Sequence, residues 1–83
     1  MNRDYPENSN LIHERLRQYR LERGMSQQTL AEEMRKLHIP MSRQTISRIE
    51  NNTRYVLDYE VLGFSLVFAV RAAGLFGVEE WAD

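Results

Sequence analysis

The sequence predicts an all-α domain. Apolar residues recur three and four positions apart through most of the first sixty residues. Capping residues or glycine stand near the ends of these segments, and no stretch shows the two-residue alternation of a half-buried strand. We therefore expect a bundle of about five helices that ends in an apolar helical extension. With 83 residues, the chain has the length for one domain with one core.

The first helix is expected to follow a mobile N-terminal tail, residues 1–9. This tail, MNRDYPENS, holds a proline and several turn formers and has no apolar period. Ser9 or Asn10 can cap the helix, and Gly24 can end it in the left-handed conformation. Its inward-facing residues should be Ile12, Leu16 and Tyr19.

The second helix is expected over QQTLAEEMRKL, residues 27–37, with Ser26 as its N-cap. Pro40 should stop it, because proline restricts the residue before it and cannot continue a helix. Ala31 allows a neighbouring helix to approach closely. The buried stripe should consist of Leu30, Met34 and Leu37.

A third short helix, about residues 42–51, carries the most informative surface. Ser42 is its expected N-cap, Ile46 and Ile49 its buried side, and Asn51 and Asn52 its end. The outward side chains are long or hydrogen-bonding and nearly free of negative charge. They are Arg43, Gln44, Ser47 and Arg48.

This outward face has the chemistry that reads DNA bases. An α-helix fits the major groove, where arginine can bond guanine and glutamine adenine in bidentate fashion, each worth about 1–3 kcal/mol of discrimination. Arg43 and Ser47 lie one turn apart, and so do Gln44 and Arg48. We predict base reading by Arg43, Gln44 and Arg48 with support from Ser47; the alternative is a solvated polar face.

Residues 61–83 form an apolar C-terminal segment. Asp58 is the expected N-cap of its helix, with Glu60 in the first turn. Residues 61–70 contain one polar side chain, Ser65, and the segment predicts one long helix or two shorter ones, with residues 75–81 as a possible final helix. The apolar run ends at Arg71, short of the 20 or so residues that a membrane span needs, so no membrane partner is expected.

A helix that is apolar all round must be buried on all sides. We expect residues 61–83 to pack partly on their own domain and partly on a second copy, with a purely intramolecular core as the alternative. Ser65, Ala69, Ala73 and Gly77 repeat every four residues and would let two helices approach closely. The predicted dimer interface is Phe64, Ser65, Phe68, Ala69, Ala73 and Phe76.

The distribution of charge favours a nucleic-acid partner, although the whole chain has a net charge of only −1. From His13 to Arg54 there are nine basic and five acidic residues, a balance of +4, whereas residues 55–83 have one and five, a balance of −4. An ordinary mixed surface is the alternative. The lack of cysteine suits a cytoplasmic protein, and the two histidines are far apart, so no metal or cofactor is expected.

The central part of the sequence resembles a known family. It runs RLRQYRLERGMSQQTLAEEM and then SRQTISRIENNTR, and over residues 12–68 it is similar to the DNA-binding domains of the phage repressor and Cro type, the Xre family. The resemblance implies a lambda-repressor-like helix-turn-helix bundle whose DNA-binding core spans residues 10–60. The matching features are Arg20 and Gly24, Ser26-Gln27, Leu30-Ala31, Thr45-Ile46-Ser47 and Ile49-Glu50.

The same resemblance implies roles for polar residues outside the reading face. Arg20 and Glu50 should form a structural ion pair between the first and third helices. The connection RKLHIPM is about five residues longer than a compact three- or four-residue turn, so either the second helix is a turn longer or the connection is a loop. The residues expected at the DNA backbone are Gln27, Ser42, Thr45, Thr53 and Arg54.

These observations predict a sequence-specific transcriptional regulator that binds double-stranded DNA. Repression of a palindromic operator by a homodimer is the expected mechanism. One alternative is a DNA-binding antitoxin whose C-terminal segment binds a toxin protein, and another is a protein-interaction module without DNA binding. We expect no enzyme, because the sequence offers no nucleophile–base pair and no phosphate-binding glycine loop.

Overall fold

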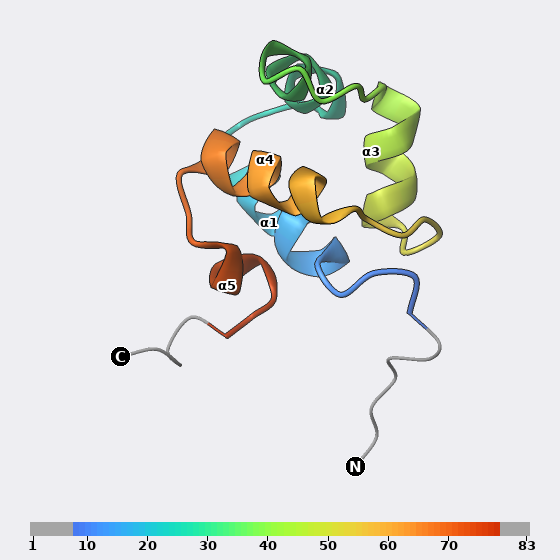
Figure 1. Cartoon of the computed structure of the whole chain (residues 1–83), viewed down its shortest axis with the longest axis vertical. Helices are drawn as coiled ribbons and strands as arrows, with labels where there is room; N and C mark the ends of the chain where they lie inside the picture. Colours follow the sequence, from blue (N-terminus) through green and yellow to red (C-terminus); the bar gives the residue numbers. More distant parts are fainter. Residues whose placement is uncertain (1–7, 79–83) are drawn as a thin grey trace.

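The computed structural model describes residues 8–78, and this part of the chain is all-helical, as the sequence predicts. Five helices follow one another without a strand among the described residues (Figure 1). They are α1 (His13–Glu22), α2 (Gln27–Lys36), α3 (Arg43–Glu50), α4 (Asp58–Phe68) and α5 (Ala72–Leu75).

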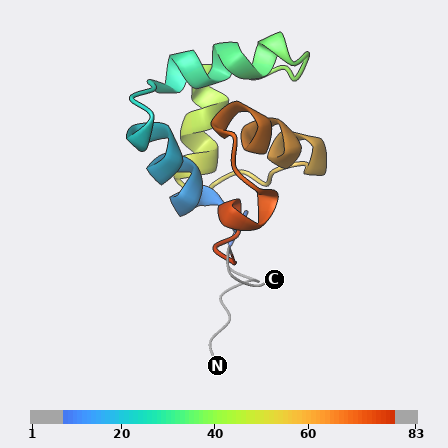
Figure 2. The same cartoon turned by 90° about the vertical axis from the view of Figure 1, so that its left-hand side faces the viewer.

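The helices enclose one core to which all five contribute. α2 crosses the start of α3 at a steep angle, α4 packs against α1 and α2, and α5 lies against α1 and α4 (Figure 2). The apolar residues expected on the inner faces of the first three helices are buried there, apart from Tyr19, which is half-buried, and Leu37. The core consists of Ile12, Leu16, Leu30, Ala31, Met34, Met41, Ile46, Ile49, Phe64, Phe68 and Leu75.

Local capping residues fix the starts of α2 and α3. The Ser26 hydroxyl accepts a hydrogen bond from the Thr29 amide at 2.9 Å, and the Ser42 hydroxyl accepts one from the Thr45 amide at 3.2 Å. Gly24 follows α1 with a φ of +66°, the left-handed conformation expected for it. These three helix boundaries are confirmed.

The predicted N-cap of the first helix is wrong, because α1 begins at His13 and Ile12 stands at its N-cap position. Asn10 is buried instead, where its Oδ1 accepts from the Ile12 amide and its Nδ2 donates to carbonyls further along the chain. Ser9, placed in the predicted tail, donates its amide to Asn52 Oδ1 at 2.9 Å. The rest of that tail, residues 1–7, lies outside the described residues.

The N-cap of the fourth helix is also one residue from its predicted place. Leu57 is the N-cap, and Asp58 is the first helical residue. The reason is Glu60, whose Oε1 accepts a hydrogen bond from the Leu57 amide at 2.9 Å and so satisfies the first free amide of the helix.

The long connection between α2 and α3 is a loop, residues 37–42, and not an extra helical turn. α2 ends at Lys36, so the chain has left the helix before it reaches Pro40, the predicted stop. His38 adopts a left-handed φ of 64°, a conformation that cannot continue an α-helix. Leu37, predicted in the buried stripe, is therefore exposed at the end of the helix. The loop returns Ile39 toward Gly63, where an added Cβ would lie 2.6 Å from Ile39 Cδ1, so the loop and α4 meet closely.

The C-terminal segment forms two helices and not one. Ala69 takes a left-handed φ of 58°, which ends α4 and sends the chain back toward α1 (Figure 1). The expected strip of small residues is therefore broken, since Ser65 and Ala73 belong to different helices. The prediction of a final helix over residues 75–81 is also wrong, because α5 ends at Leu75 and residues 76–78 are not helical. Residues 79–81 lie outside the described part.

Three residues predicted to line a dimer interface lie inside the protomer. Phe64 and Phe68 are fully buried in its core, and Ser65 is buried beside them. A surface for a second copy cannot use side chains that the protomer already covers, so the prediction is wrong for these three. Ala69 and Phe76 are exposed, and Ala73 is half-buried. Within residues 8–78 no helix combines the length and apolar character needed to span a membrane.

Candidate nucleic-acid interface

The outward face of α3 lies at one edge of the molecule (Figure 1). Arg43, Gln44 and Arg48 are exposed on it, and Ser47 is half-buried. Within residues 8–78 the side chains of these four residues make no hydrogen bond or ion pair. Their polar groups are therefore available to a ligand.

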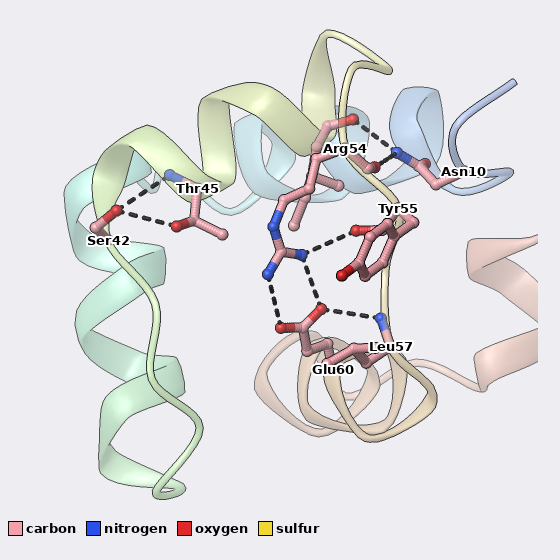
Figure 3. Close-up of polar contacts among 8 residues, drawn as sticks. Asn10, Ser42, Thr45, Arg54, Tyr55, Leu57 and Glu60 are labelled. Atoms are coloured by element: carbon pink, nitrogen blue, oxygen red, sulfur yellow. Dashed lines mark hydrogen bonds and ion pairs between the residues drawn. The ribbon is translucent and has the colours of Figure 1, made fainter.

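The inner face of α3 holds this surface in place. Ile46 and Ile49 are completely buried, which fixes the rotation of the helix about its axis. Ser42 fixes its first turn through the hydrogen bond to the Thr45 amide (Figure 3). Arg43 and Gln44 then occupy the exposed first turn, the part of a recognition helix that reaches base edges.

The residues predicted at the DNA backbone differ from the four on the outward face of α3, because the side chain of each forms a hydrogen bond within the protein. The Ser42 and Thr45 hydroxyls lie 3.0 Å apart, and Thr53 Oγ1 donates to the Arg48 carbonyl at 3.2 Å. Gln27 Nε2 donates to Glu50 Oε1 at 3.1 Å, which leaves one N–H of that amide for another partner.

Arg20 and Glu50 connect α1 to the end of α3. Arg20 Nε lies 2.6 Å from Glu50 Oε2, and Arg20 Nη2 donates to Glu50 Oε1 at 3.0 Å, which is a bidentate ion pair. Arg20 Nη1 also donates to the Met25 carbonyl at 2.8 Å. With Gln27 on the same carboxylate, the pair joins three segments around the end of the reading helix.

Arg54, predicted to contact DNA phosphate, is held in a second ion pair that the sequence analysis did not predict. Its Nη1 and Nη2 donate to the two oxygens of the buried Glu60 carboxylate at 2.9 and 3.2 Å, and Nη1 also donates to the Tyr55 carbonyl (Figure 3). Hydrogen bonding to Glu60 raises the pKa of Arg54, and the guanidinium, like any arginine side chain, is charged at physiological pH. The segment RYVLDYE held the signal, since it places a cation six residues before an acid.

Asn10 is a further residue that sequence reasoning missed. Its Nδ2 donates to the Ile49 carbonyl at 3.1 Å and to the Arg54 carbonyl at 2.9 Å (Figure 3). One of these carbonyls is in the last turn of α3, and the other follows the helix. Asn52 adopts a left-handed φ of 61°. Its side-chain oxygen accepts hydrogen bonds from the backbone amides of Ser9 and Asn10. The end of the reading helix is therefore tied to the N-terminal segment.

A comparison with known families matches this arrangement. A helix-turn-helix family model covers residues 16–63, more than half of the chain, and includes α2, α3 and the Arg20–Glu50 ion pair. The chain belongs to the Xre/Cro-type helix-turn-helix family. This helix-turn-helix protein is accordingly a DNA-binding transcription regulator, and the family is not typically enzymatic. Neither the curated proteins nor the solved structures gave a match.

Removal of the α3 cap should destabilise the helix-turn-helix protein slightly. Ser42→Ala is expected to lower the free energy of unfolding by about 1 kcal/mol, because the Thr45 amide loses its acceptor. Ser42→Asp should restore stability, since aspartate caps equally well, yet weaken DNA binding if this end faces phosphate. Urea denaturation and a DNA titration separate the two effects. Ser9→Ala, which removes an exposed hydroxyl elsewhere, should change stability by less than about 0.5 kcal/mol; an equal loss would contradict the cap.

Proposed function

We propose that this Xre-family protein is a sequence-specific repressor that binds a palindromic operator as a homodimer, with α3 in the major groove. One observation carries the proposal. On the exposed face of α3, Arg43, Gln44 and Arg48 have no partner within residues 8–78, whereas the polar residues beside that face are engaged within the protein. A face whose donors are exposed and unengaged is suited to an external hydrogen-bonding partner.

The chemistry of that face fits base edges better than phosphates alone. Arginine matches the two acceptors of guanine, and glutamine matches the donor and acceptor of adenine. We assign base reading to Arg43, Gln44 and Arg48 and a supporting contact to Ser47. The exposed start of α3, with Ser42 and Thr45, and the remaining N–H of Gln27 are assigned to the DNA backbone. Thr53 is a further backbone candidate, and Arg54 is assigned mainly to Glu60.

The homodimer follows from the size of the reading surface. One short helix contacts few base pairs, and two copies related by a two-fold axis would read two half-sites about 34–36 Å apart. A palindromic operator is the counterpart of that symmetry. Repression requires only that the bound dimer occupy a promoter, so it needs no further module.

The proposal is tested by selection of bound fragments from sheared genomic DNA at about 150 mM salt. The unaltered chain should enrich one palindromic motif. Arg43→Ala and Arg48→Ala should each weaken binding to that motif by about 1–3 kcal/mol, roughly 5- to 150-fold, and should leave the free energy of unfolding nearly unchanged. Fluorescence anisotropy with the selected duplex measures this loss.

Arg17→Ala is the matched control, since Arg17 is exposed on α1 and not on the reading face. It should retain the motif and lose little affinity. Enrichment of the same motif by the Arg43→Ala/Arg48→Ala chain would show that α3 does not read sequence. Enrichment of nothing by the unaltered chain would remove the repressor proposal.

A further inference from the structure

Among the described residues, the hydrogen bonds that join α3 to other segments gather at its C-terminal end. Arg20 forms the bidentate ion pair with Glu50, the last residue of the helix. Asn10 donates to the carbonyl of Ile49, one residue earlier. The first turn of α3, with Arg43 and Gln44, lies at the other end. The direction in which that turn points therefore depends on how the far end of the helix is held.

The side-chain amide of Asn10 is fully engaged with backbone groups. Its Nδ2 donates to the Ile49 carbonyl at 3.1 Å and to the Arg54 carbonyl at 2.9 Å (Figure 3). Its Oδ1 accepts from the Ile12 amide at 3.0 Å, and the residue is only 8% exposed. Because an amide carries its two N–H groups at a fixed angle in one plane, Asn10 holds the end of α3 and the segment after it at one separation.

Asn52 makes the reciprocal contacts from the segment after α3. Its Oδ1 accepts from the amides of Ser9 and Asn10 at 2.9 and 3.0 Å, and its Nδ2 donates to Asn8 Oδ1 at 2.6 Å. Its left-handed φ of 61° is one that glycine adopts without strain and asparagine tolerates. The turn itself therefore does not require a side chain at this position. Asn10 and Asn52, with these bonds, are called the Asn10–Asn52 clasp.

We propose that Asn10 and Asn52 are positioning residues for DNA reading, and that their clasp holds α3 at the angle at which its outward side chains reach base edges. The inference rests on the proposed function, since it takes α3 to enter the major groove. The Arg20–Glu50 pair attaches the end of α3 at one point. The clasp attaches it at a second point, and two points restrain a tilt that one leaves free.

The length of α3 shows why a small tilt matters. Its eight residues span about 12 Å, so a tilt of about 10° at the C-terminal end moves the first turn by about 2 Å. Binding groups need to be held within about 0.5 Å of their productive positions. Without the clasp, the bidentate contacts of the first turn would therefore be the first to fail.

Loss of the clasp should separate two components of DNA binding. Attraction to phosphate depends on the charge of the protein, whereas base contacts depend on the direction of each hydrogen bond. A tilted α3 should therefore lose affinity for the operator and keep its affinity for unrelated DNA. A residue that only stabilised the fold would leave the ratio of the two affinities unchanged, because unfolding removes both kinds of binding together.

Fluorescence anisotropy with the selected operator and with an unrelated duplex measures this ratio. Asn52→Gly removes the clasp oxygen and keeps the left-handed turn, and it should lower the ratio at least about five-fold, the equivalent of one bidentate base contact. Asn52→Asp keeps an oxygen for the Ser9 and Asn10 amides and should retain the ratio, although its added charge weakens binding to both duplexes. An unchanged ratio in Asn52→Gly, or an equal fall in Asn52→Asp, would overturn the proposal.

Leu75→Val is the matched control for loss of stability. Leu75 is completely buried in α5, which packs against α1 and α4, so the shorter side chain should lower the free energy of unfolding. Its ratio of operator to unrelated binding should equal that of the unaltered chain. A fall in the ratio as large as that of Asn52→Gly would show that destabilisation alone is the cause and would overturn the proposal.

Hydrogen exchange tests the clasp without DNA. The Asn10 amide should exchange at least about ten-fold faster in Asn52→Gly, whereas the Leu30 amide, bonded to the Ser26 carbonyl in α2, should be unaffected. Unchanged exchange at Asn10 would overturn the clasp. If the unaltered chain selects an operator but Asn52→Gly keeps its ratio, this inference fails and the repressor proposal stands. If the unaltered chain selects no motif, both fail.

Discussion

Glu50→Ala is expected to lower the free energy of unfolding by about 3–5 kcal/mol. The side chains of Arg20 and Glu50 are only 9% and 4% exposed, so removal of the carboxylate leaves a buried guanidinium without its counter-ion. The Gln27 amide loses its acceptor in the same change. Small domains are stable by about 5–15 kcal/mol, so a loss of this size removes much of the total.

Urea denaturation followed by circular dichroism measures this effect. Glu33→Ala is the matched control, because Glu33 pairs with Lys36 at the exposed surface, where solvent screens the ion pair, so its loss should change stability little. The double variant Arg20→Met/Glu50→Leu should recover most of the loss, since no charge is left buried. A Glu50→Ala chain within about 1 kcal/mol of the unaltered one would mean that the pair does not hold α1 to α3.

The parts of the fold that the sequence predicted are those decided by neighbouring residues. Ser26 and Ser42 cap their helices through an amide three positions on, and Gly24 supplies a left-handed residue after Arg23, the C-cap of α1. The inward faces of the first three helices follow from spacing alone. The exposed face of α3 was equally accessible to sequence reasoning, because it is what remains when Ile46 and Ile49 point inward.

The parts that the sequence did not predict depend on contacts between distant segments. Asn10 would make a good local cap, but its side chain bonds carbonyls 39 and 44 positions away, and this long-range gain outweighs the local one. The resemblance to the phage repressor and Cro type implies a DNA-backbone contact for Arg54. Only the fold brings the buried Glu60 carboxylate within 2.9 Å of it.

Ala69 shows a limit of propensity. Alanine is the best helix former, so propensity at Ala69 favours the single long helix among the two possibilities, one long helix or two shorter ones, that the sequence leaves open. In the fold, continuation of α4 would carry Leu75 away from the core, whereas the left-handed turn at Ala69 returns it to complete burial. Burial of a leucine contributes about 1.5–3 kcal/mol, enough to offset the roughly 1–2 kcal/mol cost of left-handed alanine. This turn also breaks the predicted strip of small residues, since Ser65 and Ala73 lie in different helices.

Phe64→Ala is expected to destabilise the protomer itself by about 3–5 kcal/mol. Phe64 is completely buried at the centre of α4, and its ring lies 6.5 Å from that of Phe68, which in turn lies 5.8 Å from Tyr19. Truncation leaves a cavity between α4 and its neighbours that rigid helices cannot collapse to fill.

Phe76→Ala is the matched control, because Phe76 is 44% exposed and should cost much less. Urea denaturation at several protein concentrations distinguishes a core role from an interface role. A core residue lowers stability equally at every concentration, whereas an interface residue lowers it only where dimers form. Phe64→Ala should show the first behaviour. If Phe64→Ala instead lowered the free energy of unfolding only at concentrations where dimers form, Phe64 would be an interface residue. α4 would then turn its other face to the core.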